Sequence, residues 1–203
     1  MQGLQILQTR MGFEVAETKR QADETLRIKI ALDGAAMPIT ISNMEGNLIY
    51  MNEAAGTLWS AMEQTIQVNH SSFKVTAMIG TNLVDHFDDD DMKVAFRAQL
   101  PSARTFDVNM GGKILRVTAA PVRDEHGTYL GRASQWLDRT DEVRIEKEVS
   151  NMVHAALVGN FETRLPLEGK EGFFKQLSEG LNQLSEVTQS GLTDVAGILQ
   201  RVA

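Results

Sequence analysis

The sequence predicts an α+β fold, in which a five-stranded antiparallel sheet carries short helices on one face. Three features of the chain support this prediction. Two short runs of β-forming residues are joined by a turn over residues 43–47. Helix-prone segments come next, and three further strands joined by turn-forming residues follow them. A charged helical segment precedes this domain, and a heptad-patterned α-helical segment comes after it.

The opening strands are expected in MPITIS, which starts at Met37, and in LIYMN, which ends at Asn52, and they should pair as a hairpin. Asn52 is also a candidate N-cap for the helix expected in EAAGTLWSAM. The segment Glu63–Gly80 reads as irregular and polar. A second short helix is expected over Met92–Leu100, where Pro101 halts it. The closing strands are expected at Phe106–Met110, Ile114–Val122 and Tyr129–Leu137.

Composition narrows the class of protein. Of the 203 residues, 20 are Lys or Arg and 27 are Asp or Glu, which gives a net charge of −7. This acidic balance leaves no basic surface for nucleic acid or anionic lipid. The absence of cysteine excludes disulfides, zinc–thiolate sites and covalently attached c-type haem. No apolar stretch reaches the roughly 18 residues of a membrane span and no signal peptide is visible, so we expect a cytoplasmic protein.

Helical segments flank the central domain on both sides. Residues 1–32 have apolar residues at mostly helical spacings and read as a linker helix, which leaves 33–140 as the folded domain. Residues 141–203 form a separate helical module. Its first helix has an apolar seam that begins at Ile145 and repeats every three or four residues, and Gly159 ends this helix.

An extended connector separates the two helices of the C-terminal module. Pro166 lies within FETRLPLEGKEG and is incompatible with a helix interior. Apolar residues then recur through a second helix, from Phe174 to Val202, in broken heptads. A connector of this length is required between parallel helices and would be wasteful in a plain antiparallel hairpin. The antiparallel hairpin remains the alternative.

The order of the elements, together with their residues, resembles the PAS family. NMEGNLIYMN followed by a helix is similar to the opening hairpin of that family, and GGKILRVTAAPVRDEHGTYLGRASQW is similar to its closing strands. The letters DRT, which end at Thr140, resemble the Asp-x-Thr motif through which a PAS core joins its output helix. The resemblance covers about residues 25–140 and implies a sensor domain.

The C-terminal module resembles a HAMP domain, because Gly159-Asn160-Phe161, Glu171-Gly172 and Asn182 match the sparse landmarks of that family. A HAMP unit cannot bury its seam alone, so we expect a homodimer that forms a parallel four-helix bundle. PAS followed by HAMP resembles the soluble methyl-accepting chemotaxis receptors of the haem-PAS aerotaxis group. That resemblance implies b-type haem, oxygen or another diatomic gas as the signal, and a downstream receptor signalling domain or kinase-coupling complex as the partner.

The same resemblance suggests the site residues. Trp136 falls where those sensors keep a tryptophan that donates its indole N–H to haem-bound oxygen, although it also suits a core position. His86 precedes the second short helix, where that group takes its axial iron ligand, but an ungapped count puts the ligand position on Phe87. One residue on a tight turn rotates a side chain by about 120°, so His86 faces the pocket only after a local shift. Val117 and Leu115 would face the pocket or pack the core.

The remaining histidines are weaker candidates for an iron ligand. His126 lies in a hairpin turn, His154 in the C-terminal module, and His70 in a polar segment expected on the surface. The four aspartates Asp88–Asp91 lack the spacing of a calcium loop and read as a solvated helix start. No phosphate loop, nucleophile–base pair or metal-ligand cluster is recognisable, so we do not expect an enzyme. A cofactor-free, flavin-binding or metabolite-binding PAS module for dimerisation and relay is the alternative function.

Overall fold

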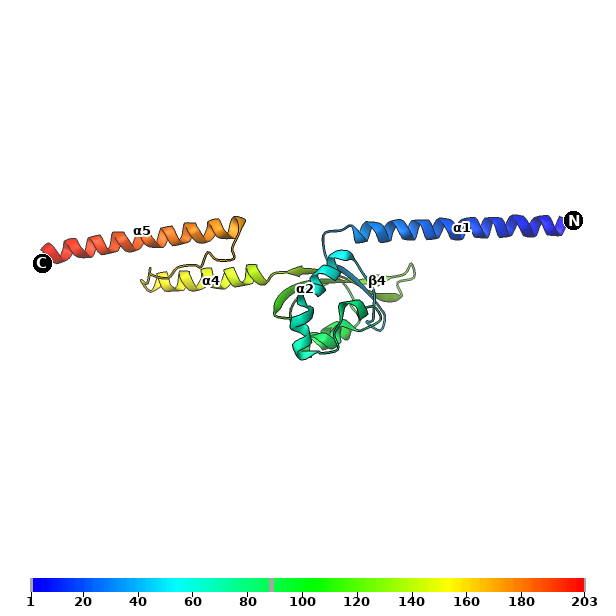
Figure 1. Ribbon diagram of the computed structural model, residues 1–203, viewed down its shortest axis with the longest axis horizontal. Helices are drawn as coiled ribbons and strands as arrows, with labels where there is room; N and C mark the ends of the chain where they lie inside the picture. The colour runs from blue at the N-terminus through cyan, green and yellow to red at the C-terminus, as the bar shows by residue number, and fades with distance from the viewer. Residues whose placement is uncertain (1, 88–89, 203) are drawn as a thin grey trace. The chain divides into compact units, whose positions relative to one another are not determined.

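The computed structural model describes residues 2–87 and 90–202 (Figure 1). The chain divides into two compact units, Met1–Asp138 and Arg139–Ala203. The first unit contains helix α1 (Gln2–Asp33), a β-sheet and several short helices, and the second contains two long helices joined by an extended connector. Among the described residues, no helix is both long enough and apolar enough to cross a lipid bilayer.

The first unit is built on an antiparallel sheet of five strands in the order β2-β1-β5-β4-β3. The strands are β1 (Ile39–Asn43), β2 (Leu48–Met51), β3 (Arg104–Met110), β4 (Lys113–Arg123) and β5 (Tyr129–Asp138). The last strand in sequence therefore lies at the centre of the sheet, between β1 and β4. This strand order is that of a PAS domain, and the predicted α+β fold is confirmed.

Strand β5 can approach β1 closely because residue 131 is a glycine. Gly131 pairs with Asn43 and has a φ of 146°, and a Cβ atom at this position would lie 1.9 Å from the carbonyl oxygen of Ser42. No other residue type fits between the two strands at that distance. The pairing of β1 with β5, which closes the sheet, therefore depends on Gly131.

Short helices connect β2 to β3 and cover one face of the sheet (Figure 1). They are α2 (Glu53–Asn69), η1 (Val75–Ala77), η2 (Leu83–His86) and α3 (Asp90–Arg97). Helix α2 is longer than predicted, because Met62 and Ile66 continue the buried stripe that Ala55 and Trp59 begin. The prediction of irregular structure over Glu63–Gly80 is therefore wrong for residues 63–69. The polar side chains between the buried positions hide the helical period of this segment.

Helix α3 begins before the predicted start at Met92 and ends before Leu100. The side chain of Asp90 lies in its first turn and pairs with Lys93 at 2.7 Å. Asp88 and Asp89, the first two residues of the aspartate run, lie outside the described residues. Leu100, at the predicted end of the helix, is buried in the loop before β3, where Pro101 disfavours helical backbone at the preceding residue.

The N-cap prediction for α2 is confirmed, and Asn52 does more than cap. Its side-chain Oδ1 accepts hydrogen bonds from the backbone N–H groups of Ala55, at 3.0 Å, and of Ile39, at 2.9 Å. Its Nδ2 donates to the backbone carbonyls of Leu32, Ala35 and Met37. Asn52 is 1% exposed. One buried amide therefore joins the start of α2, strand β1 and the segment that follows α1.

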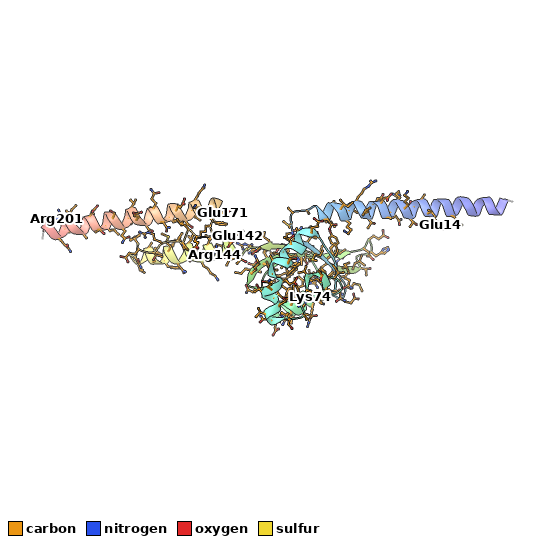
Figure 2. The ribbon with its side chains drawn as sticks, in the orientation of Figure 1. Glu14, Lys74, Glu142, Arg144, Glu171 and Arg201 are labelled. Carbon is orange, nitrogen blue, oxygen red and sulfur yellow. The ribbon has the colours of Figure 1, made fainter. Side chains whose placement is uncertain are left out.

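The second unit consists of α4 (Thr140–Leu157) and α5 (Gly172–Val202), which run in the same direction (Figure 1). The connector between them is held by polar contacts. The amide of Asn182 on α5 exchanges two hydrogen bonds with the backbone of Leu165, at 2.7 and 2.9 Å. The ammonium of Lys170 pairs with Glu148 on α4. The exposed side chains of Arg144 and Glu171 extend from this unit (Figure 2).

Candidate functional site

Strand β5 places Trp136 in the core of the first unit, opposite Val117 of β4. The indole is fully buried and packs edge-on against Trp59, with ring centroids 5.0 Å apart. Its Nε1 donates a hydrogen bond of 2.8 Å to Oγ1 of Thr40 on β1. Trp136 is thus a core residue whose single polar atom is committed to the neighbouring strand.

The interior position beside Trp136 is occupied by Phe87, not by His86. Phe87 follows the 3₁₀ turn η2, is fully buried, and lies 5.1 Å from the ring of Phe96 and 6.4 Å from that of Trp136. Leu115 and Val117 on β4 are fully buried in the same cluster. The structure therefore brings four of the five predicted site residues together. They are Phe87, Leu115, Val117 and Trp136.

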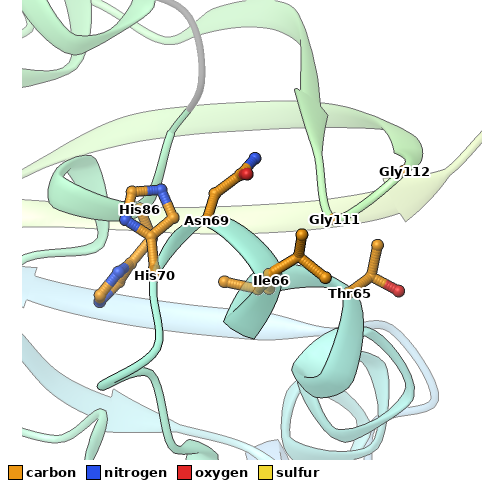
Figure 3. A pocket seen from close by; sticks show the side chains of 8 residues that line it. Thr65, Ile66, Asn69, His70, His86, Gly111 and Gly112 are labelled. Atoms are coloured by element: carbon orange, nitrogen blue, oxygen red, sulfur yellow. The ribbon is translucent and has the colours of Figure 1, made fainter.

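The imidazole of His86 lies in a different place, at the C-terminal end of α2 (Figure 3). Its ring centroid is 4.8 Å from that of Phe73 and 5.5 Å from that of His70, and both contacts are edge-on. His70 and His86 border a cavity of about 160 Å³. The other lining residues are Thr65, Ile66, Val68, Asn69, Gly111 and Gly112. In the described part of the chain, Nδ1 of His86 is buried and has no hydrogen-bond partner.

Burial lowers the pKa of the His86 imidazole below its ordinary value, and the positive charge that His70 can carry lowers it further, whereas Asp85 opposes both effects. His86 is therefore held neutral near pH 7, with a lone pair available on one ring nitrogen. His70, predicted on the surface, is half-buried because it caps α2 and packs against His86. His126 lies exposed in its turn, and His154 lies exposed on α4.

The lowered pKa of His86 predicts a pH dependence of stability. The unfolded chain binds a proton at this residue at higher pH than the folded chain does, so the free energy of unfolding should fall as the pH drops below about 6.5. The replacement His86→Gln should remove part of this slope in denaturation curves measured between about pH 7 and pH 5. An identical slope in wild type and His86→Gln would contradict the assignment.

The imidazole of His86 meets one chemical requirement of a haem site, the axial ligand to iron. Iron in b-type haem takes an axial ligand from a neutral imidazole, and His86 has a buried ring nitrogen that is unpartnered across residues 2–87 and 90–202. The interior around Trp136 is apolar and aromatic, as a porphyrin requires. The structure does not bring His86 and Trp136 into contact, because the turn at η2 directs Phe87 inward and His86 toward His70. Among the described residues, no three His, Cys, Asp or Glu side chains are placed to bind a metal ion together.

Sequence reasoning did not anticipate Arg132, which is buried in the core of the first unit with 4% exposure. Arg132, Ser134 and Trp136 alternate along β5 and so share its buried face. The period of two in RASQW is a signal that could have placed Arg132 inside once Trp136 was taken as a core residue. An arginine at such a position is unusual, because charged residues are almost never fully buried unless paired.

The chain passes from strand β5 of the first unit almost directly into helix α4 of the second. Strand β5 ends at Asp138, whose carboxylate pairs with Lys113 on β4, and α4 begins at Thr140. In the first turns of α4, Arg139 pairs with Glu146 at 2.9 Å. Trp136 is therefore two residues from the end of its strand, and a single residue separates the strand from the helix.

Comparison with known proteins supports the chemoreceptor resemblance. No family model matches the chain. The chain is 34% identical over 177 residues to the methyl-accepting chemotaxis protein McpB of Pseudomonas aeruginosa. The match covers 87% of this chain and 26% of that protein, so the chain spans about a quarter of the length of this curated relative.

Two solved structures are also similar to the chain. The Aer2 receptor from Vibrio cholerae, described as a dual PAS-heme oxygen sensor, is 23% identical, with a TM-score of 0.44, over 50% of this chain and 93% of that one. The PAS domain of Bordetella pertussis BvgS is 16% identical, with a TM-score of 0.43, over 66% of this chain and 98% of that one. On its own strand order the first unit has a PAS fold, and the chain is a homologue of a segment of a methyl-accepting chemotaxis protein.

Proposed function

We propose that this chain is the sensing and relaying segment of a chemoreceptor, in which the PAS domain binds a ligand and α4 and α5 pass the change onward. The observation that carries the proposal is the position of Trp136. Its indole is hydrogen-bonded to Thr40 across the β1–β5 pair, two residues before β5 ends. A ligand that changes this bond acts on the strand that leads directly into α4.

The relay requires only a modest bias. Coupling free energies between sites in proteins are typically about 1–3 kcal/mol, which is the size of one or two hydrogen bonds. A change at Trp136 that shifts β5 relative to Thr40 supplies an energy of this order. Two helices that have alternative packings of similar energy respond to such a bias by a shift in population.

For the helical unit we propose a HAMP-type relay that dimerises. Two observations support this arrangement. Helices α4 and α5 run in the same direction, and the side-chain amide of Asn182 forms two hydrogen bonds with the backbone of Leu165 in the connector. Seven apolar residues in the C-terminal part of α5 are exposed in the single chain. They are Leu184, Val187, Leu192, Val195, Ile198, Leu199 and Val202. A second copy of the chain would bury this seam in a parallel four-helix bundle, and the output would pass to a receptor signalling domain or kinase-coupling complex.

The full chain should therefore sediment as a dimer at tens of micromolar, because its exposed seam is buried only by association. Leu184→Glu should shift the protein toward monomer, since Leu184 is 63% exposed in the single chain and a carboxylate there would be desolvated in the bundle. Gln183→Glu, at the neighbouring exposed position, is the matched control and should remain dimeric. A monomeric wild-type chain in sedimentation equilibrium would contradict the HAMP assignment.

For the PAS domain we propose b-type haem as the cofactor and oxygen or another diatomic gas as the signal. His86 is the residue that would hold the iron, through a ring nitrogen that has no hydrogen-bond partner among the described residues. When bound, haem supplies an iron atom that binds diatomic gases. Trp136 would offer a bound gas its indole N–H, which only donates and which is bonded to Thr40 in this structure. The buried side chains of Phe87, Leu115 and Val117 would keep water away from that N–H.

A cofactor-free, flavin-binding or metabolite-binding PAS module is the second candidate, and the burial of Phe87 favours it. Phe87 and Phe96 pack against Trp136 in the interior, and His86 lies to one side of that cluster. In this alternative the domain serves dimerisation and signal relay. The two candidates differ in colour, because only haem gives the intense Soret absorption.

A further inference from the structure

Two histidines meet at the C-terminal end of helix α2, although η1 and most of η2 separate them in sequence. The ring centroids of His70 and His86 are 5.5 Å apart, and the ring planes meet at 82°. Both residues line the cavity of about 160 Å³ at this end of the helix (Figure 3). Nδ1 of His86 is buried and has no hydrogen-bond partner within residues 2–87 and 90–202. Two side chains of a type that binds metal ions therefore border one cavity.

The distance between the two rings is close to the distance that a shared metal ion requires. A Zn²⁺ ion lies about 2.0–2.1 Å from an imidazole nitrogen and prefers tetrahedral coordination, so two imidazoles on one ion have centroids about 5 Å apart. The observed 5.5 Å reaches that value through small rotations of the side chains. A buried ring nitrogen without a partner also costs free energy, and a metal ion between the rings would satisfy it.

The surroundings of the two histidines suit a cation. His70 is the C-cap residue of α2, and the carbonyl groups at the end of a helix carry partial negative charge. Among the described residues, no lysine or arginine lines the cavity. Thr65 and Asn69 line it and are exposed, so an ion can enter from solvent. A water molecule takes up about 30 Å³ of liquid volume, so the cavity has room for an ion together with bound water.

We propose that His70 and His86 together bind a divalent transition-metal ion of the Zn²⁺ type, with water completing the coordination. Imidazole suits zinc, copper and nickel, whereas magnesium and calcium prefer oxygen ligands. With two protein ligands, the site binds more weakly than a structural zinc site with four. A neutral imidazole has one lone pair for one metal, so the ion site belongs to the haem-free domain and does not rest on haem binding.

The ion site adjoins the aromatic core that contains Trp136. Phe87 follows His86 directly, and its ring centroid is 6.4 Å from that of Trp136. An ion that fixes the position of His86 therefore also constrains the aromatic neighbour of the indole. Because Trp136 lies on β5, which leads into α4, occupancy of the site bears on the strand that leaves the domain.

The test uses the full chain, purified without haem and freed of metal ions with a chelator. Zn²⁺ is titrated by calorimetry, and Mg²⁺ serves as the control ion. His70→Gln removes one ligand but keeps the backbone N–H that bonds to the carbonyl of Ile66 at the end of α2. His86→Gln removes the other ligand. The matched control is the double variant His126→Gln/His154→Gln, which removes the remaining two histidines, both exposed.

Wild type and the control variant should each bind one Zn²⁺ per chain, at least about tenfold more tightly than His70→Gln or His86→Gln does, and should not bind Mg²⁺. Zn²⁺ should also raise the thermal midpoint of wild type and of the control variant more than that of the two ligand variants. Co²⁺ in place of Zn²⁺ should give wild type a visible absorption band that His70→Gln lacks. Should one ligand variant fail to fold, the other still decides.

Three results would overturn the proposal. They are a wild-type chain that does not bind Zn²⁺, equal Zn²⁺ affinities in wild type and the ligand variants, and a loss of affinity confined to the control variant. A loss in His86→Gln with none in His70→Gln would likewise contradict a shared ion. Because haem is absent throughout, these outcomes are independent of the Soret band that tests the proposed sensor.

Discussion

Replacing Asn52 with alanine should lower the free energy of unfolding of the PAS domain by about 3–4 kcal/mol. The asparagine side chain is 1% exposed and makes five hydrogen bonds with backbone groups. Alanine leaves these groups buried and unpaired, and it also removes the N-cap of α2. The loss exceeds that of an ordinary cap because the same amide also holds the start of β1 and the segment after α1.

Chemical denaturation followed by tryptophan fluorescence measures this effect, because Trp59 and Trp136 both lie in the core of the domain. Asn109→Ala, at an exposed position on β3, is the matched control and should change stability by less than about 1 kcal/mol. Equal and small effects of the two replacements would show that the hydrogen bonds of Asn52 do not organise the domain.

Replacing Trp136 with phenylalanine should speed the loss of oxygen from the haem-bound protein by about tenfold. The change keeps an aromatic ring in the core but removes the only hydrogen-bond donor of the side chain. A hydrogen bond to a partly charged acceptor is worth about 1.5 kcal/mol or more, which corresponds to a factor of ten or above. The same change leaves Oγ1 of Thr40 without the indole N–H and should lower stability slightly.

Trp59→Phe provides a close control for this experiment. Trp59 is equally buried and packs against Trp136, but in the described part of the chain its own Nε1 has no partner. Exchanging its indole for a phenyl ring should therefore remove no hydrogen bond. Stopped-flow measurement of oxygen dissociation should separate the two variants. An unchanged rate of oxygen dissociation in a stable Trp136→Phe protein would show that Trp136 only packs in the core and does not contact bound oxygen.

Much of the fold follows from local sequence. Turn residues such as Gly46 and Gly127 mark the hairpins, alternation marks the strands, and Asn52 marks the start of α2. The far end of α2 was missed because Glu63 and Gln67 make the segment polar, while their neighbours Met62 and Ile66 keep the buried stripe. When polar residues interrupt a stripe of apolar residues, the helix is recognised only if the helical spacing of the apolar residues is traced beyond the interruption.

The candidate site was harder to predict than the fold, because its residues are set by which face of each strand or turn is buried in the core. His86 and Phe87 are neighbours in sequence, yet the turn at η2 places the phenyl ring among the core aromatics and the imidazole against His70. Arg132 is buried because β5 becomes the central strand, and that pairing joins residues far apart in sequence. A local pattern alone suggests a solvated arginine.

The absorbance spectrum of the full chain, expressed with haem supply, tests the proposed sensor most directly. If His86 holds haem iron, wild type should show a Soret band that shifts on exposure to oxygen, and His86→Ala should lose it. Phe87→His should not improve haem content, because an imidazole at residue 87 would replace a ring that packs against Phe96 and Trp136. A colourless wild-type protein, or a Soret band that survives His86→Ala unchanged, would contradict the account.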